Sequence, residues 1–214
     1  MTCSSFLVDT TAAIVLDTSV IINLHACGRG ESILASIPNR VVLPQAVIGE
    51  LEREAGRSDA ELIFAKELIE KQIAELAWLD ERAFDVFEKL ITGSPSLGDG
   101  EAATIALAST TGAIPVIDER KGRTRAATLL GKSALPWSLD LLLHPALEAV
   151  LTEAERLETI FRAFRAGRMR IDEERCEAIV SLMGIERALQ CTSLPNYKAR
   201  RNVWLAQKPA AINA

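Results

Sequence analysis

Residues 14–24 read IVLDTSVIINL, in which a short apolar run is followed by a polar Asp-Thr-Ser step and a second apolar run. The stretch predicts a buried strand over 14–17 and a helix over 19–27 behind it. The other predicted strands cover 40–43, 75–79, 113–118 and, at an edge of the sheet, 134–137. Strands separated by helices at this spacing predict an α/β fold, a three-layer α/β/α sandwich with a central parallel sheet of about five strands.

The pattern changes beyond residue 138. Two amphipathic helices are predicted, over 145–165 and 172–183, and the last thirty residues read as irregular or only partly ordered. We therefore predict a domain over 1–138 and a C-terminal helical extension over 139–214, packed on that domain because it is short for a core of its own.

Four carboxylates lie at the junctions between these elements. Asp17 and Asp118 end two of the strands, Glu50 lies just inside the helix after RVVLP, and Glu101 opens the helix EAATIALA. The carboxyl ends of parallel strands share one edge of the sheet, and ligands bind at that edge. Like charges gathered there repel one another unless a cation lies between them. The sequence therefore predicts bound Mg²⁺ or Mn²⁺ and metal-assisted phosphodiester chemistry.

Polar neighbours complete the predicted site. The hydroxyls of Thr18 and Ser19 are expected to orient Asp17. Asp99 lies two residues before Glu101 and is expected to be the helix N-cap or an outer ligand of the metal. No His or Lys is placed to act as a general base, so the metal has to activate the attacking water.

Composition excludes several other classes of protein. The 214 residues are 49% hydrophobic and 5% aromatic, which suits aliphatic helices packed on a sheet and does not suit disorder. No apolar run approaches the roughly 18 residues needed to cross a bilayer, and the N-terminus does not read as a signal peptide. Four cysteines without a CxxC pair and only two histidines argue against a zinc site and favour reduced cysteines in a cytoplasmic protein.

The net charge of −5 is unevenly distributed. Residues 1–118 carry 8 Lys/Arg and 18 Asp/Glu, whereas residues 119–214 carry 16 Lys/Arg and 11 Asp/Glu. An acidic metal pocket bordered by basic residues suits a nuclease, because the basic side chains hold the phosphates next to the scissile one. The residues expected to do so are Arg120, Lys121, Arg123 and Arg125. For the later group over 162–170, an ordinary solvated helix face explains the charges equally well.

Four fragments, in this order, carry a resemblance to a known family. IVLDTSVIINL, the Glu of VIGELE, SLGDGEAATIALA and IPVIDERKGR resemble the motifs of PIN-domain nucleases, in particular a toxin-like, VapC-type subgroup. The resemblance covers roughly residues 12–135, with a weaker match over RAFRAGRMRIDEE. Any one fragment occurs in many α/β proteins, but the four together are specific.

The resemblance implies an activity and partners. PIN domains are metal-dependent ribonucleases, and many are the toxin half of a toxin–antitoxin pair. On this reading Asp17, Glu50, Glu101 and Asp118 hold one or two Mg²⁺ or Mn²⁺ ions, with Asp99 nearby, and RNA is cut to a 5′-phosphate and a 3′-hydroxyl. The resemblance also implies a homodimer and a cognate antitoxin. The alternative is a PIN-like domain that binds RNA or protein without cutting, although the presence of all four acids favours an enzyme.

Three other α/β families lack their signatures here. A haloacid-dehalogenase-type phosphatase needs a second Asp at position 19, which is Ser19. A receiver domain needs a phosphoacceptor Asp on its third strand and a Lys after its fifth, and neither is evident. A dinucleotide-binding fold needs GxGxxG after the first strand, which is absent.

Overall fold

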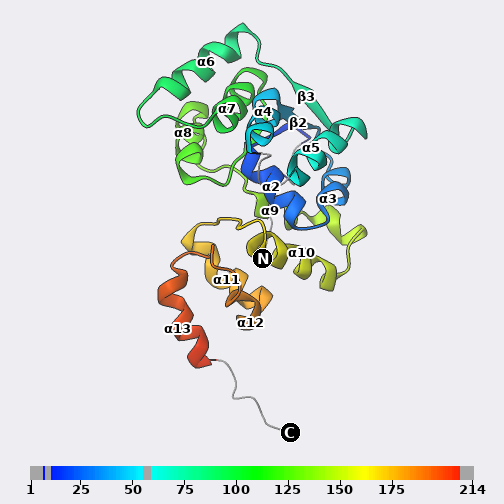
Figure 1. The fold of residues 1–214 in the computed structure, drawn as a ribbon, viewed down its shortest axis with the longest axis vertical. Helices are drawn as coiled ribbons and strands as arrows, with labels where there is room; N and C mark the ends of the chain where they lie inside the picture. Colours follow the sequence, from blue (N-terminus) through cyan, green and yellow to red (C-terminus); the bar gives the residue numbers. More distant parts are fainter. Residues whose placement is uncertain (1–6, 8–10, 55–58, 208–214) are drawn as a thin grey trace.

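The computed structural model describes residues 7, 11–54 and 59–207, and a four-stranded parallel sheet lies at its centre (Figure 1). The strand order is β3-β2-β1-β4, and the strands are β1 Ile14–Leu16, β2 Val41–Pro44, β3 Ala74–Ala77 and β4 Ile114–Val116. Because β2 and β4 flank β1 on opposite sides, the chain order reverses between β1 and β4. A crevice outside the carboxyl ends of the strands is expected at such a switch point.

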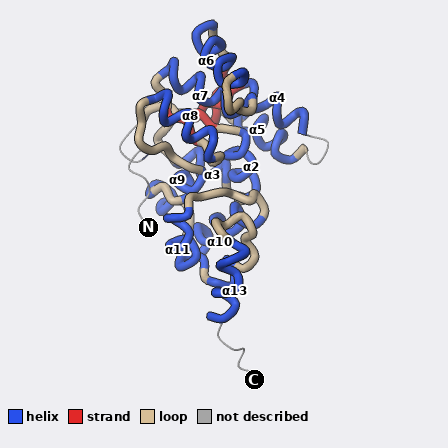
Figure 2. Tube along the Cα trace, turned by 90° about the vertical axis from the view of Figure 1, so that its left-hand side faces the viewer, coloured by secondary structure: helices blue, strands red, loops and turns tan. Residues whose placement is uncertain are grey.

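Alternation along each strand divides the core into two faces. Ile14 and Leu16 of β1 belong to the largest hydrophobic cluster, whereas Val15 between them packs with Ala106 and Leu107 on the opposite face. Helices cover both faces, as Figure 2 shows by the helical segments around the strands. The predicted three-layer sandwich with a parallel sheet is therefore confirmed.

Most of the predicted helices of the sandwich are present. They are α2 Thr18–Ala26, α3 Gly30–Ser36, α4 Gln45–Glu54, α5 Ala60–Glu70, α6 Glu81–Thr92, α7 Asp99–Thr111, α8 Arg120–Leu130 and α9 Ser138–Leu142. Helix α7 is Ala-rich and buried along much of its length, which lets it pack closely against the sheet. Its first residue is Asp99 and its N-cap is Gly98, so the prediction that Asp99 caps this helix is wrong.

The predicted fifth strand over 134–137 is also wrong. This segment approaches the outer edge of β4 through a single backbone hydrogen bond, from Ile117 N to Pro136 O at 3.4 Å. The guanidinium of Arg123 donates to the same Pro136 O at 2.9 Å and to Leu135 O at 2.5 Å. At the outer edge of β4, the Arg123 side chain therefore makes hydrogen bonds where a fifth strand would have paired.

The C-terminal part of the chain is helical and shares the main core. Its elements are the 3₁₀ helix η1 Pro145–Ala149 and the helices α10 Glu153–Arg165, α11 Glu173–Met183, α12 Ile185–Ala188 and α13 Tyr197–Gln207. The single helix predicted over 145–165 is interrupted because Thr152 forms a capping box with Glu155 and starts α10. The last thirty residues, expected to be irregular or partly ordered, contain α13, and residues 208–214 lie outside the described part.

One hydrophobic cluster runs from the sheet into these helices. It joins Ile14 and Leu16 to Phe164, Ile179 and Trp204. The extension lies below the sandwich in the view of Figure 1. Across the residues that the structure describes, no helix combines the length and the apolar composition required to span a membrane.

Candidate active site

The four predicted acids lie at the carboxyl edge of the sheet or on the helices beside it. Asp17 directly follows β1, and Asp118 follows β4 by two residues. The register pairs Leu16 with Val116, and Asp17 N donates to Val116 O at 3.3 Å, so the two Asp residues leave neighbouring strands at almost the same level. Glu50 lies in α4 and Glu101 in the first turn of α7.

Burial and neighbouring carboxylates raise the pKa values of Asp17 and Glu101. Burial raises the pKa of Asp17 from its usual 3.8 to about 7, and the carboxylates of Glu101 and Glu50 act in the same direction. The Ser19 hydroxyl opposes this rise by donating to Asp17 Oδ2 at 2.7 Å, as the sequence predicted. Burial also raises the pKa of Glu101, and Glu119 and Glu50 add to that rise. The site therefore holds more negative charge than its own side chains neutralise.

Glu50 is held by two donors from different elements. The Thr18 hydroxyl donates to Glu50 Oε2 at 2.5 Å, and Gly100 N donates to Glu50 Oε1 at 2.8 Å. Gly100 is needed for this approach, because a Cβ there would lie 2.4 Å from Thr18 Oγ1. The prediction that the Thr18 hydroxyl orients Asp17 is wrong, since this hydroxyl binds Glu50.

Glu101 has an unsatisfied oxygen. Its Oε1 is buried and has no hydrogen-bond partner among the described residues. A Cβ on Gly122 would lie only 2.5 Å from this oxygen, so the first turn of α8 packs directly against the carboxylate. A buried carboxylate oxygen without a donor is costly unless a cation or a water molecule binds it.

Asp118 is bound by donors that the sequence did not single out as a group. Ser138 donates through its backbone N at 2.7 Å and its hydroxyl at 2.6 Å, and Asn23 Nδ2 donates to Asp118 Oδ2 at 2.6 Å. Burial raises the pKa of Asp118, and these hydrogen bonds oppose the rise. Asn23 lies on α2, 95 positions before Asp118. Ser138 gave no signal, because only the fold brings it to Asp118.

Asp99 lies in the first turn of α7, two residues before Glu101. It forms an exposed ion pair with Arg53, with Asp99 Oδ2 and Arg53 Nη2 at 2.8 Å. Among the residues that the structure describes, no group of three or more His, Cys, Asp or Glu side chains is gathered closely enough to hold a metal ion by itself.

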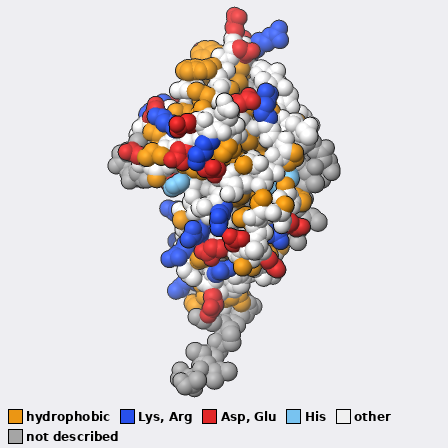
Figure 3. Space-filling model, turned by 90° about the vertical axis from the view of Figure 1, so that its right-hand side faces the viewer, with side chains coloured by type: hydrophobic (Ala, Val, Ile, Leu, Met, Phe, Trp, Pro, Cys, Tyr) orange, Lys and Arg blue, Asp and Glu red, His pale blue; other side chains and the backbone are white. Residues whose placement is uncertain are grey.

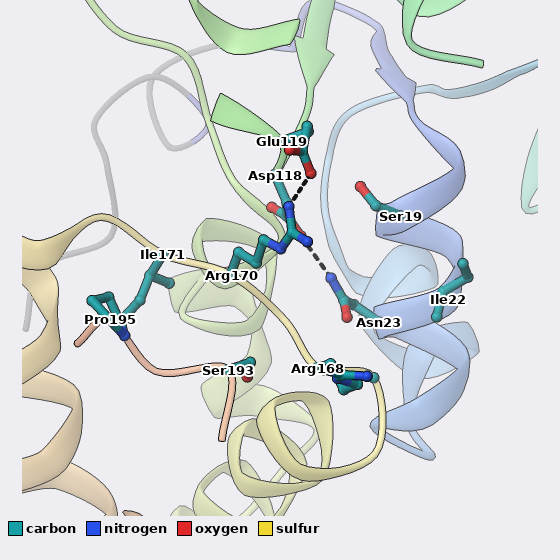
Figure 4. Close-up of a pocket in the computed structure, with 11 residues that line it drawn as sticks. Ser19, Ile22, Asn23, Asp118, Glu119, Arg168, Arg170, Ile171, Ser193 and Pro195 are labelled. Atoms are coloured by element: carbon teal, nitrogen blue, oxygen red, sulfur yellow. Dashed lines mark hydrogen bonds and ion pairs between the residues drawn. The ribbon is translucent and has the colours of Figure 1, made fainter. Parts of the chain in front are cut away.

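A cavity of about 550 Å³ opens beside Asp118. Ser19, Asn23 and Asp118 lie on its sandwich side, and Arg168 and Arg170, from the loop between α10 and α11, lie on the opposite side (Figure 4). The C-terminal extension therefore forms one wall of the space next to the acids, which the sequence did not predict.

A comparison with protein families agrees with this arrangement. The family model for the PIN domain matches residues 13–185, which is most of the chain. The chain belongs to the PIN-domain family. No curated protein and no solved structure matches it. PIN domains are generally nucleases and typically use divalent metal ions.

The acids of this PIN domain suit such an ion. All the candidate ligands are carboxylate oxygens, which Mg²⁺ and Mn²⁺ prefer. The unpartnered Glu101 Oε1 and the raised pKa of Asp17 mark the place where a positive charge would relieve the greatest electrostatic cost. Asp17, Glu50 and Glu101 are therefore the residues available to hold the metal, with Asp118 on the neighbouring strand.

The basic residues after β4 have different surroundings. Arg120 is exposed, Lys121 Nζ donates to Ser96 O, and Arg125 is half-buried. Arg123 points inward and is not at the rim where it was predicted, since its guanidinium binds carbonyl groups and lies 3.6 Å from the centroid of the Trp137 ring. Burial lowers the pKa of Arg123 to about 10.

Two other side chains near basic residues have partners within the protein. The Glu119 carboxylate binds Arg170. Trp204 follows the basic residues Lys198, Arg200 and Arg201 in sequence. It is buried and packs edge-on against Tyr197, with the ring centroids 6.0 Å apart, so it belongs to the core.

Proposed function

We propose that this PIN domain is a metal-dependent endoribonuclease and the toxin of a toxin–antitoxin pair. The observation that carries the enzymatic part is the uncompensated charge at the carboxyl edge of the sheet. Burial and the carboxylates of Glu101 and Glu50 raise the pKa of Asp17. Burial and the carboxylates of Glu119 and Glu50 raise the pKa of Glu101, whose Oε1 lacks a donor. A protein that only bound RNA would have no need for buried carboxylates that repel both one another and the phosphates.

The side chains around the acids are arranged to keep ligands in place. Thr18 and Gly100 fix Glu50, Ser19 fixes Asp17, and Ser138 with Asn23 fixes Asp118. A carboxylate that is already oriented needs little rearrangement when it takes up a cation. When bound, a divalent ion lowers the pKa of a water molecule and stabilises the charge of the reacting phosphate.

The protonation of Asp17 matters for this role. With a pKa of about 7, Asp17 keeps its proton below neutral pH in the metal-free protein. A cation must displace that proton, so metal binding should strengthen as the pH rises through 7. We expect cleavage to rise over the same range.

The activity is tested by cleavage of single-stranded RNA with Mg²⁺, with Mn²⁺ and with EDTA. Asp17→Asn and Glu101→Gln should abolish the metal-dependent cleavage, because a carboxamide is neutral and a poor ligand. The matched control is Glu52→Gln, on the same helix as Glu50, because Glu52 is exposed and pairs with Lys66 at 3.1 Å. Cleavage that persists in EDTA, or that survives Asp17→Asn, would refute the proposed mechanism.

The toxin role has its own test. Induced expression of the chain in bacteria should arrest growth, and Asp17→Asn should relieve the arrest at equal expression. A neighbouring small gene encoding a DNA-binding protein that restores growth would identify the antitoxin. An active ribonuclease whose expression leaves growth unchanged would point to a housekeeping nuclease. A chain that retains RNA without cutting it would instead be the PIN-like binding domain of the alternative reading.

The proposed homodimer rests on exposed apolar side chains. Trp78 is 70% exposed and Phe84, on α6, is 52% exposed. Figure 3 shows hydrophobic side chains at the upper end of the face in view, and Figure 1 places α6 at the upper end of the molecule. Apolar groups of this size commonly mark an interface. Light scattering should give twice the mass of the chain, and Phe84→Glu should reduce it to the monomer; a monomeric parent protein contradicts the proposal.

A further inference from the structure

The cavity beside Asp118 joins the nuclease domain to the C-terminal extension. At about 550 Å³ it lies in the range of small-ligand sites. Two of its lining residues are arginines from the loop between α10 and α11, although the acids it borders come from the sheet edge. Figure 4 shows Arg170 reaching across toward Glu119, with Arg168 farther along the same loop.

The backbone of this loop is held in place. Met169 N donates to Ala163 O at 3.1 Å, and the Met169 side chain is buried in the main core. A Cβ on Gly167 would lie 2.6 Å from Asn23 Oδ1, so the loop packs directly on α2 beside the amide that binds Asp118. The two arginines therefore project from a rigid support next to the acids.

Arg168 has an unusual backbone conformation for its side chain. Its φ is +57°, in the left-handed region where glycine is favoured and an L side chain is strained. Strain of this kind tends to occur at functional positions. The Arg168 side chain is exposed, and among the described residues it has no hydrogen bond or ion pair, so its charge is available to a ligand.

Of the two arginines that line the cavity, Arg168 is the one without an ion-pair partner among the described residues. Arg170 is paired with Glu119, and the Asp118 carboxylate is bound by Ser138 and Asn23. An exposed Arg–Glu pair is weak, and a guanidinium has five N–H donors, so Arg170 can bind a phosphate while it keeps Glu119. An anion that enters the cavity therefore meets one free and one shareable guanidinium.

We infer that this cavity is a subsite for a backbone phosphate of the RNA strand next to the cleavage point, with Arg168 and Arg170 as its ligands. The inference rests on the proposed function, since it takes the acids beside the cavity to be the cleavage site. Contacts to phosphate carry no base information, so the subsite sets affinity and register and leaves the sequence preference unchanged. The C-terminal extension then forms part of the surface along which the RNA strand binds.

The test measures RNA binding in EDTA, so that it does not depend on cleavage. Arg168→Gly is the main variant, because glycine suits the left-handed backbone and the substitution removes an exposed side chain together with its guanidinium. We expect its melting temperature to equal or exceed that of the parent. Its affinity for labelled single-stranded RNA should fall by about fivefold for every sequence alike, and the salt slope should decrease by about 0.7 for the lost phosphate contact.

Two other variants complete the design. Arg170→Ala should weaken binding in the same sequence-independent way. Arg165→Ala is the control. Arg165 has the same charge at the end of α10, but it lies over the Phe161 ring, 5.7 Å from its centroid, and does not line the cavity. Its affinity should match that of the parent. Arg168→Gly with parental affinity and salt slope overturns the inference, as does a parent protein that binds no RNA.

The outcomes separate this inference from the proposed function. Arg168-dependent RNA binding without metal-dependent cleavage would support the subsite and refute the nuclease. Metal-dependent cleavage together with an RNA affinity that Arg168→Gly does not change would support the nuclease and refute the subsite. Inorganic phosphate serves as a second probe. Suppose that it raises the melting temperature of the parent but not of Arg168→Gly, while both proteins bind RNA with the same affinity. In that case the site binds free phosphate, and the assignment to RNA is overturned.

Discussion

Asp17→Asn should stabilise the metal-free protein while it abolishes cleavage. The side chain is buried, and the difference between its ordinary pKa of 3.8 and about 7 corresponds to ~4 kcal/mol at 1.36 kcal/mol per pKa unit. Because the folded-state pKa lies above the unfolded value, the folded protein keeps a proton that the unfolded chain releases. The free energy of unfolding therefore falls as the pH rises from about 4 to about 7, and the full cost is present above 7.

The neutral amide removes this cost but still accepts the Ser19 hydrogen bond. We expect the variant to be more stable than the parent by about 3 kcal/mol at pH 8, with the difference vanishing below about pH 4. Urea unfolding in EDTA at a series of pH values measures it. Mg²⁺ at about 100 times its dissociation constant should then stabilise the parent by ~2.7 kcal/mol and the variant hardly at all.

Asp99→Asn is the control for this series. Asp99 is exposed and paired with Arg53, so its neutralisation should change the free energy of unfolding by less than about 1 kcal/mol at any pH. If Asp17→Asn is no more stable than the parent at pH 8, or if the difference between them does not depend on pH, burial of the charged Asp17 carboxylate is not what destabilises the metal-free protein.

Three further substitutions test the supports of the site. Gly122→Ala brings a methyl group against Glu101 Oε1 and should displace the carboxylate, lowering metal-dependent cleavage on the order of 10²-fold; a parental rate contradicts this packing. Ser138→Ala removes the hydroxyl donor of buried Asp118 and should cost about 1–3 kcal/mol in urea unfolding, more at pH 8 than at pH 5, because the charged form needs the donor. A loss that is equal at both pH values would argue against this reason. Arg123→Met should lower the free energy of unfolding by about 2–4 kcal/mol and leave the salt slope of RNA binding unchanged. A smaller salt slope at an unchanged melting temperature would show instead that Arg123 contacts RNA phosphate.

Much of the fold was predictable because the signals are local. The apolar run and polar step of 14–24 specify β1 and α2 within a residue or two. The parallel sheet then follows from the alternation of strands and helices, and it brings Asp17 and Asp118 to one edge whatever the remaining details are. Where a motif residue lies at the end of a strand, the sequence alone was sufficient to place its backbone.

The predictions that failed depend on contacts between distant segments. The segment 134–137 reads locally as a strand, but Arg123 occupies its carbonyl groups from a helix that precedes it. Arg123 itself was placed at the rim by its nearness to Asp118 in sequence. Helix α8 starts at Arg120, so Arg123 lies one turn further on and faces back toward the sheet edge. Proximity in sequence does not specify the direction of a side chain once a helix begins.

The same limit applies to the partners of the acids. The Thr18 hydroxyl lies next to Asp17 in sequence, yet it binds Glu50, which is 32 positions away. Ser138 is 20 positions from Asp118 and became visible as a donor only when the start of α9 was placed beside β4. The sequence predicted which residue types gather at the edge, whereas the hydrogen bonds that orient them depend on the packing of whole elements.

The guanidinium at the outer edge of β4 also limits how this protein can associate. A chain that adds a strand to a sheet needs successive free N–H and C=O groups along the edge. On this edge Pro115 has no N–H, Ile117 N is bound to Pro136, and Ile117 O accepts from Arg123 at 2.8 Å. A second molecule therefore has no ladder to continue here, and the sheet cannot grow from β4 into an intermolecular sheet or a fibril.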